Sequence, residues 1–193
     1  CADSAWKGTG GRWLETFVWS FRGASTPAGL SKETVASVLR WSAANVTAAR
    51  NDCGRTDRSD ARARFDGRTD RRPSVTPKGT CGRTDGTNVV GFGALPGDFL
   101  AITCIWTVGG RIVEADMKLD GAVAWATALE GCRDRILLAS VATHEFGHVF
   151  GLGHVGEAKH GLLTMSVRIN GDCQPAETTL GLGDLIGLES LYP

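Results

Sequence analysis

The 193-residue sequence predicts an α+β fold, in which a mixed, twisted sheet with an antiparallel edge strand packs with two long helices and a C-terminal helix. Segments rich in β-branched and aromatic residues predict the strands, and two longer segments have helical periodicity. The pair Gly109-Gly110 separates two predicted strands, as in a β-hairpin. The order strand, helix, strands, helix, irregular segment and helix suggests one α+β domain, spanning residues 1–193.

The first strand and the first long helix are predicted in the N-terminal quarter of the chain. Residues 13–21 (WLETFVWSF) mix aromatic and β-branched residues with partial alternation, which indicates a strand. Ser31 is a candidate N-cap, and Glu33 falls in the first helical turn. Apolar residues then follow at helical spacing, so a helix is predicted from about residue 31 to residue 49.

The second half of the chain predicts the remaining elements. Residues 87–93, 99–107 and 111–119 have strand composition. Residues 134–151 are predicted to form the second long helix, which Gly151 and Gly153 end. A short third helix is expected from about residue 181 to residue 191.

Residues 50–87 differ in composition from the rest of the chain. They hold nine of the sixteen arginines, and GRTD occurs three times, starting at residues 54, 67 and 82. These spacings are not a fixed period, so no repeat architecture is predicted. We interpret the segment as an exposed insertion rather than a dedicated site, because charge-rich loops are usually solvated. Calcium stays an unsupported possibility, since the spacing of the aspartates fits no EF-hand loop: Asp57, Asp60, Asp66, Asp70 and Asp85.

Six scattered cysteines, none of them in a CxxC pair, predict disulfides in an oxidising compartment. The alternative is a cytosolic protein with buried free thiols. The sequence does not choose among the pairings; we favour Cys53–Cys81, Cys104–Cys132 and Cys1–Cys173. The chain opens without a signal-peptide pattern, so we expect a processed form of a secreted, extracellular protein.

The charge balance offers no argument for a polyanionic partner. The chain has 21 basic and 21 acidic residues, so its formal net charge is zero. This composition gives no electrostatic basis for binding nucleic acid or an anionic membrane. No run of about 18 apolar residues is present, so no transmembrane helix is expected. We expect a monomer.

The segment HEFGHVFGLGH, residues 144–154, contains three of the four histidines. His144 and His148 lie four residues apart on a predicted helix, so both imidazoles project from one face and can share an ion. Gly151 permits a sharp turn of the backbone, which can return His154 to the same ion. Three nitrogen ligands with a fourth position open for water are typical of catalytic zinc.

Glu145 lies beside the first of these histidines and is not needed for coordination. Its carboxylate could act as general base on a zinc-activated water and then pass the proton to the amine that leaves a cleaved peptide bond. The alternative is that the histidines are ordinary packing residues. The extended pattern HExxHxxGxxH argues against this, because it places a glycine and a glutamate in register with the histidines.

The extended pattern resembles the zinc signature of the metzincin metallopeptidases. Within that clan, LGLGDLIGLESLYP at the C-terminus and GALPGDFLAIT at residues 93–103 resemble the matrixins. The resemblance covers residues 88–193 well and residues 13–49 loosely, but not residues 50–87. It implies a metzincin-like catalytic domain and a secreted zinc endopeptidase that hydrolyses peptide bonds of proteins.

The resemblance also implies roles for residues outside the histidine motif. Met165 would form the methionine turn beneath the metal rather than simply fill the core, and Asp184 would brace that turn. One segment would pair antiparallel with an extended substrate: Phe99, Leu100, Ala101, Ile102 and Thr103. The residues after the methionine would line the pocket for the residue that follows the cut: Ser166, Val167 and Arg168.

The chain departs from the matrixin pattern in several places. Matrixins usually carry two adjacent acids in the last helix, whereas here the pair is Gly183-Asp184. The family's contact between the first acid and the N-terminal ammonium is therefore missing, and we expect a Cys1–Cys173 disulfide to tether the N-terminus instead. No histidine precedes the catalytic helix to hold a second, structural zinc, so one zinc is expected. The only tyrosine is Tyr192, which argues against the astacin branch.

Two other function classes are consistent with parts of the sequence. One is a zinc-binding but non-proteolytic module, such as an adhesin or toxin built on a peptidase scaffold. The other is a disulfide-rich structural domain with incidental metal. The presence of Glu145 favours catalysis, because neither alternative needs a general base.

Overall fold

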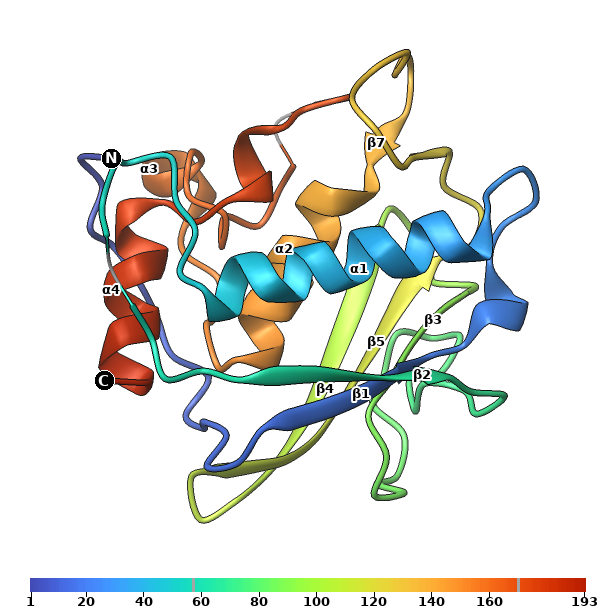
Figure 1. The fold of residues 1–193 in the computed structure, drawn as a ribbon, viewed down its shortest axis with the longest axis horizontal. Helices are drawn as coiled ribbons and strands as arrows, with labels where there is room; N and C mark the ends of the chain where they lie inside the picture. Colours follow the sequence, from blue (N-terminus) through green and yellow to red (C-terminus); the bar gives the residue numbers. More distant parts are fainter. Residues whose placement is uncertain (57, 170) are drawn as a thin grey trace.

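The computed structural model describes residues 1–56, 58–169 and 171–193. Its centre is a five-stranded sheet with the strand order β2-β1-β3-β5-β4 (Figure 1). Strand β4 pairs antiparallel with β5 at one edge, whereas β2, β1, β3 and β5 pair in parallel with one another in that order. The predicted α+β class with a mixed sheet is therefore confirmed. The strands are β1 (Phe17–Phe21), β2 (Ala63–Arg68), β3 (Val89–Gly93), β4 (Ala101–Val108) and β5 (Arg111–Asp120).

Two long helices, α1 (Lys32–Thr47) and α2 (Leu138–Val149), lie side by side on one face of the sheet (Figure 1). The Ser31 hydroxyl accepts a hydrogen bond from the N–H of Thr34, which confirms the predicted N-cap. The smaller elements are α3 (Glu157–His160), α4 (Leu182–Leu191), the short parallel pair β6 (Trp125–Ala126) and β7 (Ile136–Leu137), and two 3₁₀ turns, Gly23–Ser25 and Ala176–Thr178.

Two predicted elements, the first strand and the second long helix, each begin four residues later in the structure than predicted. Strand β1 begins at Phe17 because Trp13 bonds elsewhere, its backbone N–H to the Tyr192 hydroxyl and its indole N–H to the Val149 carbonyl. Helix α2 begins at Leu138 because Asp134 has a φ of 48° and the residues after it pair as strand β7. The hairpin at Gly109-Gly110 is present, with both glycines at positive φ.

The interpretation of residues 50–87 as an exposed insertion is wrong in part. Strand β2 belongs to the central sheet, where it pairs in parallel with β1. Its exposed positions carry Arg64, Asp66 and Arg68, while Ala63 and Phe65 pack against the core. The apolar pattern of this strand is weak because only one of its faces packs against the core. That face carries small residues and a single phenylalanine. Asp57 lies outside the described residues.

The segment between β2 and β3 is fixed to the outer face of the sheet by two buried carboxylates of β5. Glu114 accepts hydrogen bonds from the backbone N–H groups of Asp85 and Gly86. Asp116 accepts from Ser74 and Val89, at 2.7 Å each. Both carboxylates are almost fully buried. The segment is thus an ordered cover on the sheet and not a solvated loop throughout.

All three predicted disulfide pairings are wrong. The structure joins Cys1 to Cys53, Cys81 to Cys104 and Cys132 to Cys173. Cys81 meets β4 because its segment folds back over the outer face of the sheet. Cys173 meets the loop before β7, where its N–H also bonds the Arg135 carbonyl. The N-terminus is tethered, but to Cys53 rather than to Cys173.

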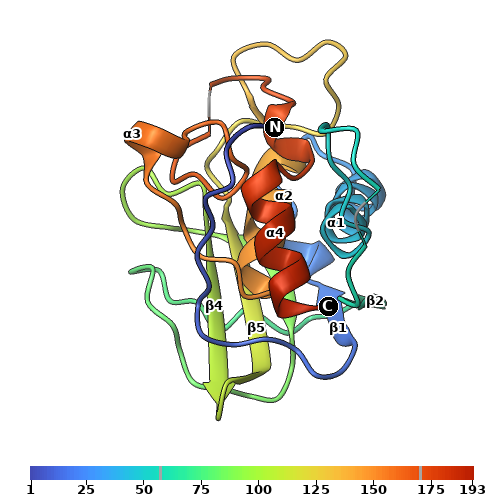
Figure 2. The ribbon, with the colours of Figure 1, turned by 90° about the vertical axis from the view of Figure 1, so that its left-hand side faces the viewer.

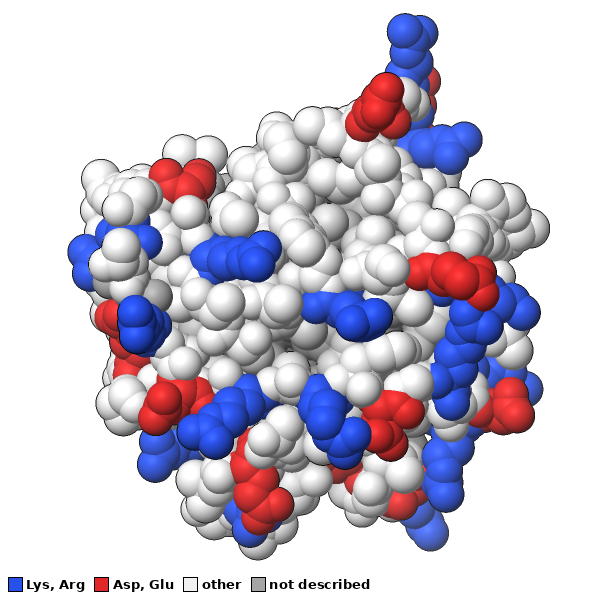
Figure 3. Space-filling view, in the orientation of Figure 1, with Lys and Arg blue, Asp and Glu red and all other residues white. Residues whose placement is uncertain are grey.

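Acidic and basic side chains are interspersed on the face shown in Figure 3, in the orientation of Figure 1. Arginines of residues 50–87 form ion pairs, among them Arg64 with Asp66, Arg68 with Glu33 and Arg71 with Asp85. Among the described residues, no helix has both the length and the apolar character needed to cross a bilayer.

Candidate active site

Helix α2 carries His144, Glu145 and His148 toward the edge of the sheet formed by β4. His144 is 7% exposed and Glu145 is 5% exposed, so both lie at the buried base of a cleft. The helix passes directly over Met165: a Cβ built on Gly147 would stand 2.3 Å from the Met165 sulfur. Position 147 therefore requires glycine for this packing, a constraint that the sequence pattern did not reveal.

The turn after α2 brings the chain back to the side of the helix that carries His144 and His148. Gly151 has a φ of 89°, in the left-handed region that favours glycine. A Cβ at this position would also stand 2.3 Å from the Gly11 carbonyl oxygen. The N–H of Gly153 donates to the Lys7 carbonyl at 2.7 Å. The N-terminal segment thus packs against the turn that leads to His154.

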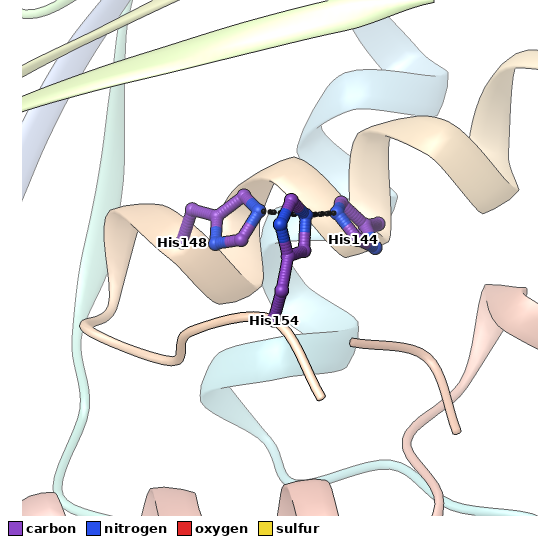
Figure 4. Close-up of side chains that lie close together, drawn as sticks. All are labelled: His144, His148 and His154. Atoms are coloured by element: carbon purple, nitrogen blue, oxygen red, sulfur yellow. Dashed lines mark hydrogen bonds between the residues drawn. The ribbon is translucent and has the colours of Figure 1, made fainter. Parts of the chain in front are cut away.

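The three imidazoles converge on one point (Figure 4). The Nε2 atom of His154 lies 3.0 Å from Nε2 of His144 and 3.0 Å from Nε2 of His148. Nitrogens around a tetrahedral zinc with bonds of about 2.0–2.1 Å are separated by roughly 3.3 Å. The spacing of the three nitrogens is close to that value.

The hydrogen bonds behind the rings set their tautomers. Nδ1 of His144 lies 2.7 Å from the Thr164 carbonyl, and Nδ1 of His148 lies 2.8 Å from the Leu152 carbonyl. A carbonyl oxygen only accepts, so each Nδ1 carries the proton and each Nε2 of a neutral ring presents a lone pair. Burial lowers the pKa of His144 to about 3 and that of His154 to about 4, with the charge of His148 as the next cause. Three converging imidazole nitrogens, with Nδ1 of His144 and of His148 bonded to backbone carbonyls, fit a zinc ion.

Glu145 stands beside these histidines in the lining of the cleft. Burial raises the pKa of its carboxyl, and the nearby His148 and a hydrogen bond from Thr103 oppose that rise. The Thr103 hydroxyl lies 2.6 Å from Glu145 Oε2. A carboxyl group with a raised pKa, at the base of a cleft, takes up a proton more readily than an exposed one and is a candidate acid–base group.

Asp184 of α4 holds the turn that contains Met165. Its carboxylate accepts hydrogen bonds from the backbone N–H groups of Thr164 at 2.9 Å, Met165 at 3.3 Å and Gly181 at 3.0 Å. Met165 is 1% exposed and Asp184 is fully buried. Burial raises the pKa of Asp184 to about 6 despite these three donors. The geometry is the one that the resemblance implies for this pair.

A cleft of about 740 Å³ joins the histidines and Glu145 to two flanking segments. One is the edge-strand segment 99–103, and the other is residues 166–168, so every residue expected to bind substrate lines the cleft. Phe99 and Val167 stand more than half exposed at its rim. The outer edge of β4 has no strand partner among the described residues.

The structure adds five lining residues that were not among the expected site residues: Gly79, Asp98, Ile136, Val141 and Ile169. Gly79 belongs to the segment between β2 and β3, which the Cys81–Cys104 disulfide fixes to β4. Ser166 is buried, and its hydroxyl bonds the Glu157 carboxylate, which also accepts from the Arg168 N–H. Glu157 therefore anchors the start of the pocket wall, a role without any local signal in the sequence.

One other described group has the spacing of metal ligands, formed by Cys1, Asp52 and Cys53. Its two sulfurs are joined in a disulfide, which removes them as thiolate ligands. His160, the fourth histidine, lies apart from the triad and faces Asp3, with Nδ1 2.8 Å from the carboxylate. The histidine triad is the group whose donor chemistry fits zinc.

The sequence model of the matrixin family matches residues 96–193, which is half of the chain and includes the triad, Glu145, Met165 and Asp184. The chain therefore belongs to the matrixins, a family of zinc metallopeptidases. No curated protein sequence matches the chain.

Proposed function

We propose that this matrixin is a secreted, monomeric zinc endopeptidase that hydrolyses internal peptide bonds of extended protein segments. The observation that carries the proposal is the convergence of three imidazole lone pairs beside the buried carboxyl of Glu145, at the base of an open cleft. Catalytic zinc sites combine three protein ligands with an open position, and a general base must lie close to that position.

His144, His148 and His154 would hold the ion, and when bound it would supply Lewis-acid polarisation of a water and of the scissile carbonyl. Glu145 accepts the proton from the attacking water and later gives it to the leaving amine. Burial supports both steps, because a raised pKa brings the carboxyl closer to neutral pH.

The substrate would add a strand to the free edge of β4. Residues 99–103 present backbone groups along one side of the cleft, and an extended peptide can pair with them. Residues 166–168 would form part of the wall of the pocket for the residue after the cut. The apolar side chains of Ile136, Val141 and Val167 favour an apolar residue there.

Three disulfides support secretion, since such bonds persist in oxidising compartments. The formal net charge of zero gives no electrostatic basis for a polyanionic substrate.

The test is cleavage of casein, gelatin and a broad peptide library by the wild type, with and without o-phenanthroline. Glu145→Ala should retain zinc and lose activity by about 10²–10⁴-fold, the usual contribution of a general base. Glu130→Ala, the same change at an exposed position that does not line the cleft, serves as the matched control. A wild type that binds zinc and cleaves nothing in the library would instead support a non-proteolytic zinc module.

A further inference from the structure

Among the described residues, Thr103 is the one whose side chain hydrogen-bonds to the Glu145 carboxylate. Its Oγ1 lies 2.6 Å from Glu145 Oε2 and 3.4 Å from the Glu145 backbone carbonyl. An ionised carboxylate only accepts, so the threonine hydroxyl is the donor. A separation of 2.6 Å is typical of a charge-assisted O–H···O⁻ bond, which is stronger than a neutral one.

The sheet fixes the direction of this hydroxyl. Thr103 pairs with Met117 of β5, whose side chain is buried in the core between the sheet and the helices. Because side chains alternate along a strand, Thr103 faces α2, while Cys104 faces the opposite side and is bonded to Cys81. The disulfide and the β5 ladder thus hold the hydroxyl at one place beneath the helix.

The residues around Thr103 show that packing alone does not call for a hydroxyl here. Its neighbours on the same face, Ala101 and Ile105, are apolar and pack against the core. A valine would fill the same volume and suit a strand equally well. The polar atom is therefore accounted for by its contact with the Glu145 carboxylate.

We propose that Thr103 is a positioning residue for Glu145, holding Oε2 so that the other oxygen, Oε1, faces the reacting water. This inference rests on the proposed peptidase function. In the described part of the chain no protein group bonds Oε1, and Glu145 lines the cleft. A general base works only within hydrogen-bond reach of its proton, and small misplacements are costly. The Thr103 side chain thereby affects catalysis through the position of Glu145. This role is separate from any backbone contact that β4 makes with substrate.

The decisive comparison is Thr103→Val against Thr103→Ser. Valine keeps the shape of threonine and removes the donor, whereas serine keeps the donor. Thr103→Val should lower kcat about tenfold and change KM by less than about twofold. The reason is that a Glu145 carboxylate that is free to rotate spends less time aligned with the reacting water. Thr103→Ser should restore most of kcat. Thr107→Val, the same change at an exposed position of β4, is the control and should behave as the wild type.

Two readouts do not depend on turnover. The variants should bind zinc as tightly as the wild type, because Thr103 is not a ligand. Crystal structures of the zinc-free proteins should show the Glu145 carboxylate displaced in Thr103→Val and in its original place in Thr103→Ser.

Retention of full kcat by Thr103→Val would overturn the proposal. So would a change confined to KM, or a failure of serine to restore kcat, since either outcome indicates a structural role for the strand. If the wild type itself proves inactive, the peptidase proposal fails, and the crystal structures still decide whether Thr103 holds Glu145: an unmoved carboxylate in Thr103→Val overturns the inference.

Discussion

The backbone carbonyl of Ala5 lies directly against the Cα of Gly183, so that a Cβ on Gly183 would stand 1.9 Å from the Ala5 oxygen. One turn further along α4, a Cβ on Gly187 would stand 2.9 Å from the Trp6 ring. The N-terminal segment runs along α4 (Figure 2) and continues to the backbone hydrogen bonds with the turn before His154. Matrixins usually carry an acid where this chain has Gly183, and here the N-terminal backbone occupies that space.

Gly183→Ala should therefore push the N-terminal segment away from α4. Because the neighbour is backbone rather than a flexible side chain, the overlap cannot relax cheaply, and a loss of about 1–3 kcal/mol in unfolding free energy is expected. Urea denaturation measures the loss, and limited proteolysis should cut the loosened segment. Gly156→Ala is the control, since no atom lies within 4 Å of its added Cβ. Equal stability of the two variants would show that the segment does not pack as described.

Zinc binding should depend on the triad and not on the fourth histidine. Removing a ligand costs more than removing an outer-shell partner, so His148→Ala and His154→Ala should each weaken zinc affinity by more than about 100-fold. His160→Ala should keep its zinc, because that ring faces Asp3. Metal analysis of the purified proteins and competition with a chelating dye make the measurement. Zinc loss in His160→Ala would contradict the assignment of three ligands.

Asp184 should give the stability of the fold a defined dependence on pH. Burial raises the folded-state pKa of Asp184 to about 6 from its ordinary value of 3.8, so the folded protein keeps this proton to higher pH than the unfolded chain. The associated stability is fully present below about pH 3.8 and is lost as the pH rises through about 6. Over that window the loss is on the order of 3 kcal/mol.

Asp184→Asn removes this titration. Its stability relative to the wild type should rise between pH 4 and pH 7, although it starts lower because the amide cannot accept all three backbone hydrogen bonds. Urea midpoints at one-unit pH steps test this. Asp116, whose pKa burial also raises to about 6, titrates in both proteins and cancels in the difference. A constant difference across the range would refute the assignment.

The Cys132–Cys173 disulfide should stabilise the wall of the pocket. It links the segment after Met165 to the loop before β7 and closes a sequence separation of 41 residues. Replacing both cysteines by serine should cost about 2–4 kcal/mol and expose residues 171–176 to proteases. A nonreduced digest of the wild type provides the control, because it must yield a Cys132–Cys173 peptide pair. Recovery of Cys1 linked to Cys173 would instead restore the pairing expected from the sequence.

The sequence by itself determined the features that depend on local spacing. Helical periodicity places His144 and His148 on one face of a helix, and a glycine two residues after the helix returns the third histidine. The Ser31 cap, both long helices and the hairpin at Gly109-Gly110 are likewise decided within a few residues of chain. Periodicity and turn chemistry act over such short distances, so a single sequence reveals them.

Tertiary structure alone decided the contacts between distant segments. The Cys81–Cys104 pairing depends on how the segment between β2 and β3 folds onto the sheet. The spacing of cysteines along the chain does not predict this arrangement. Only one face of strand β2 packs against the core, so its sequence lacks the apolar pattern of a central strand. Thr103 reaches Glu145 across 42 residues, and Ala5 excludes a side chain from position 183. Each of these contacts exists only because the sheet order brings two segments together, and that order is a property of the packed core rather than of any local sequence pattern.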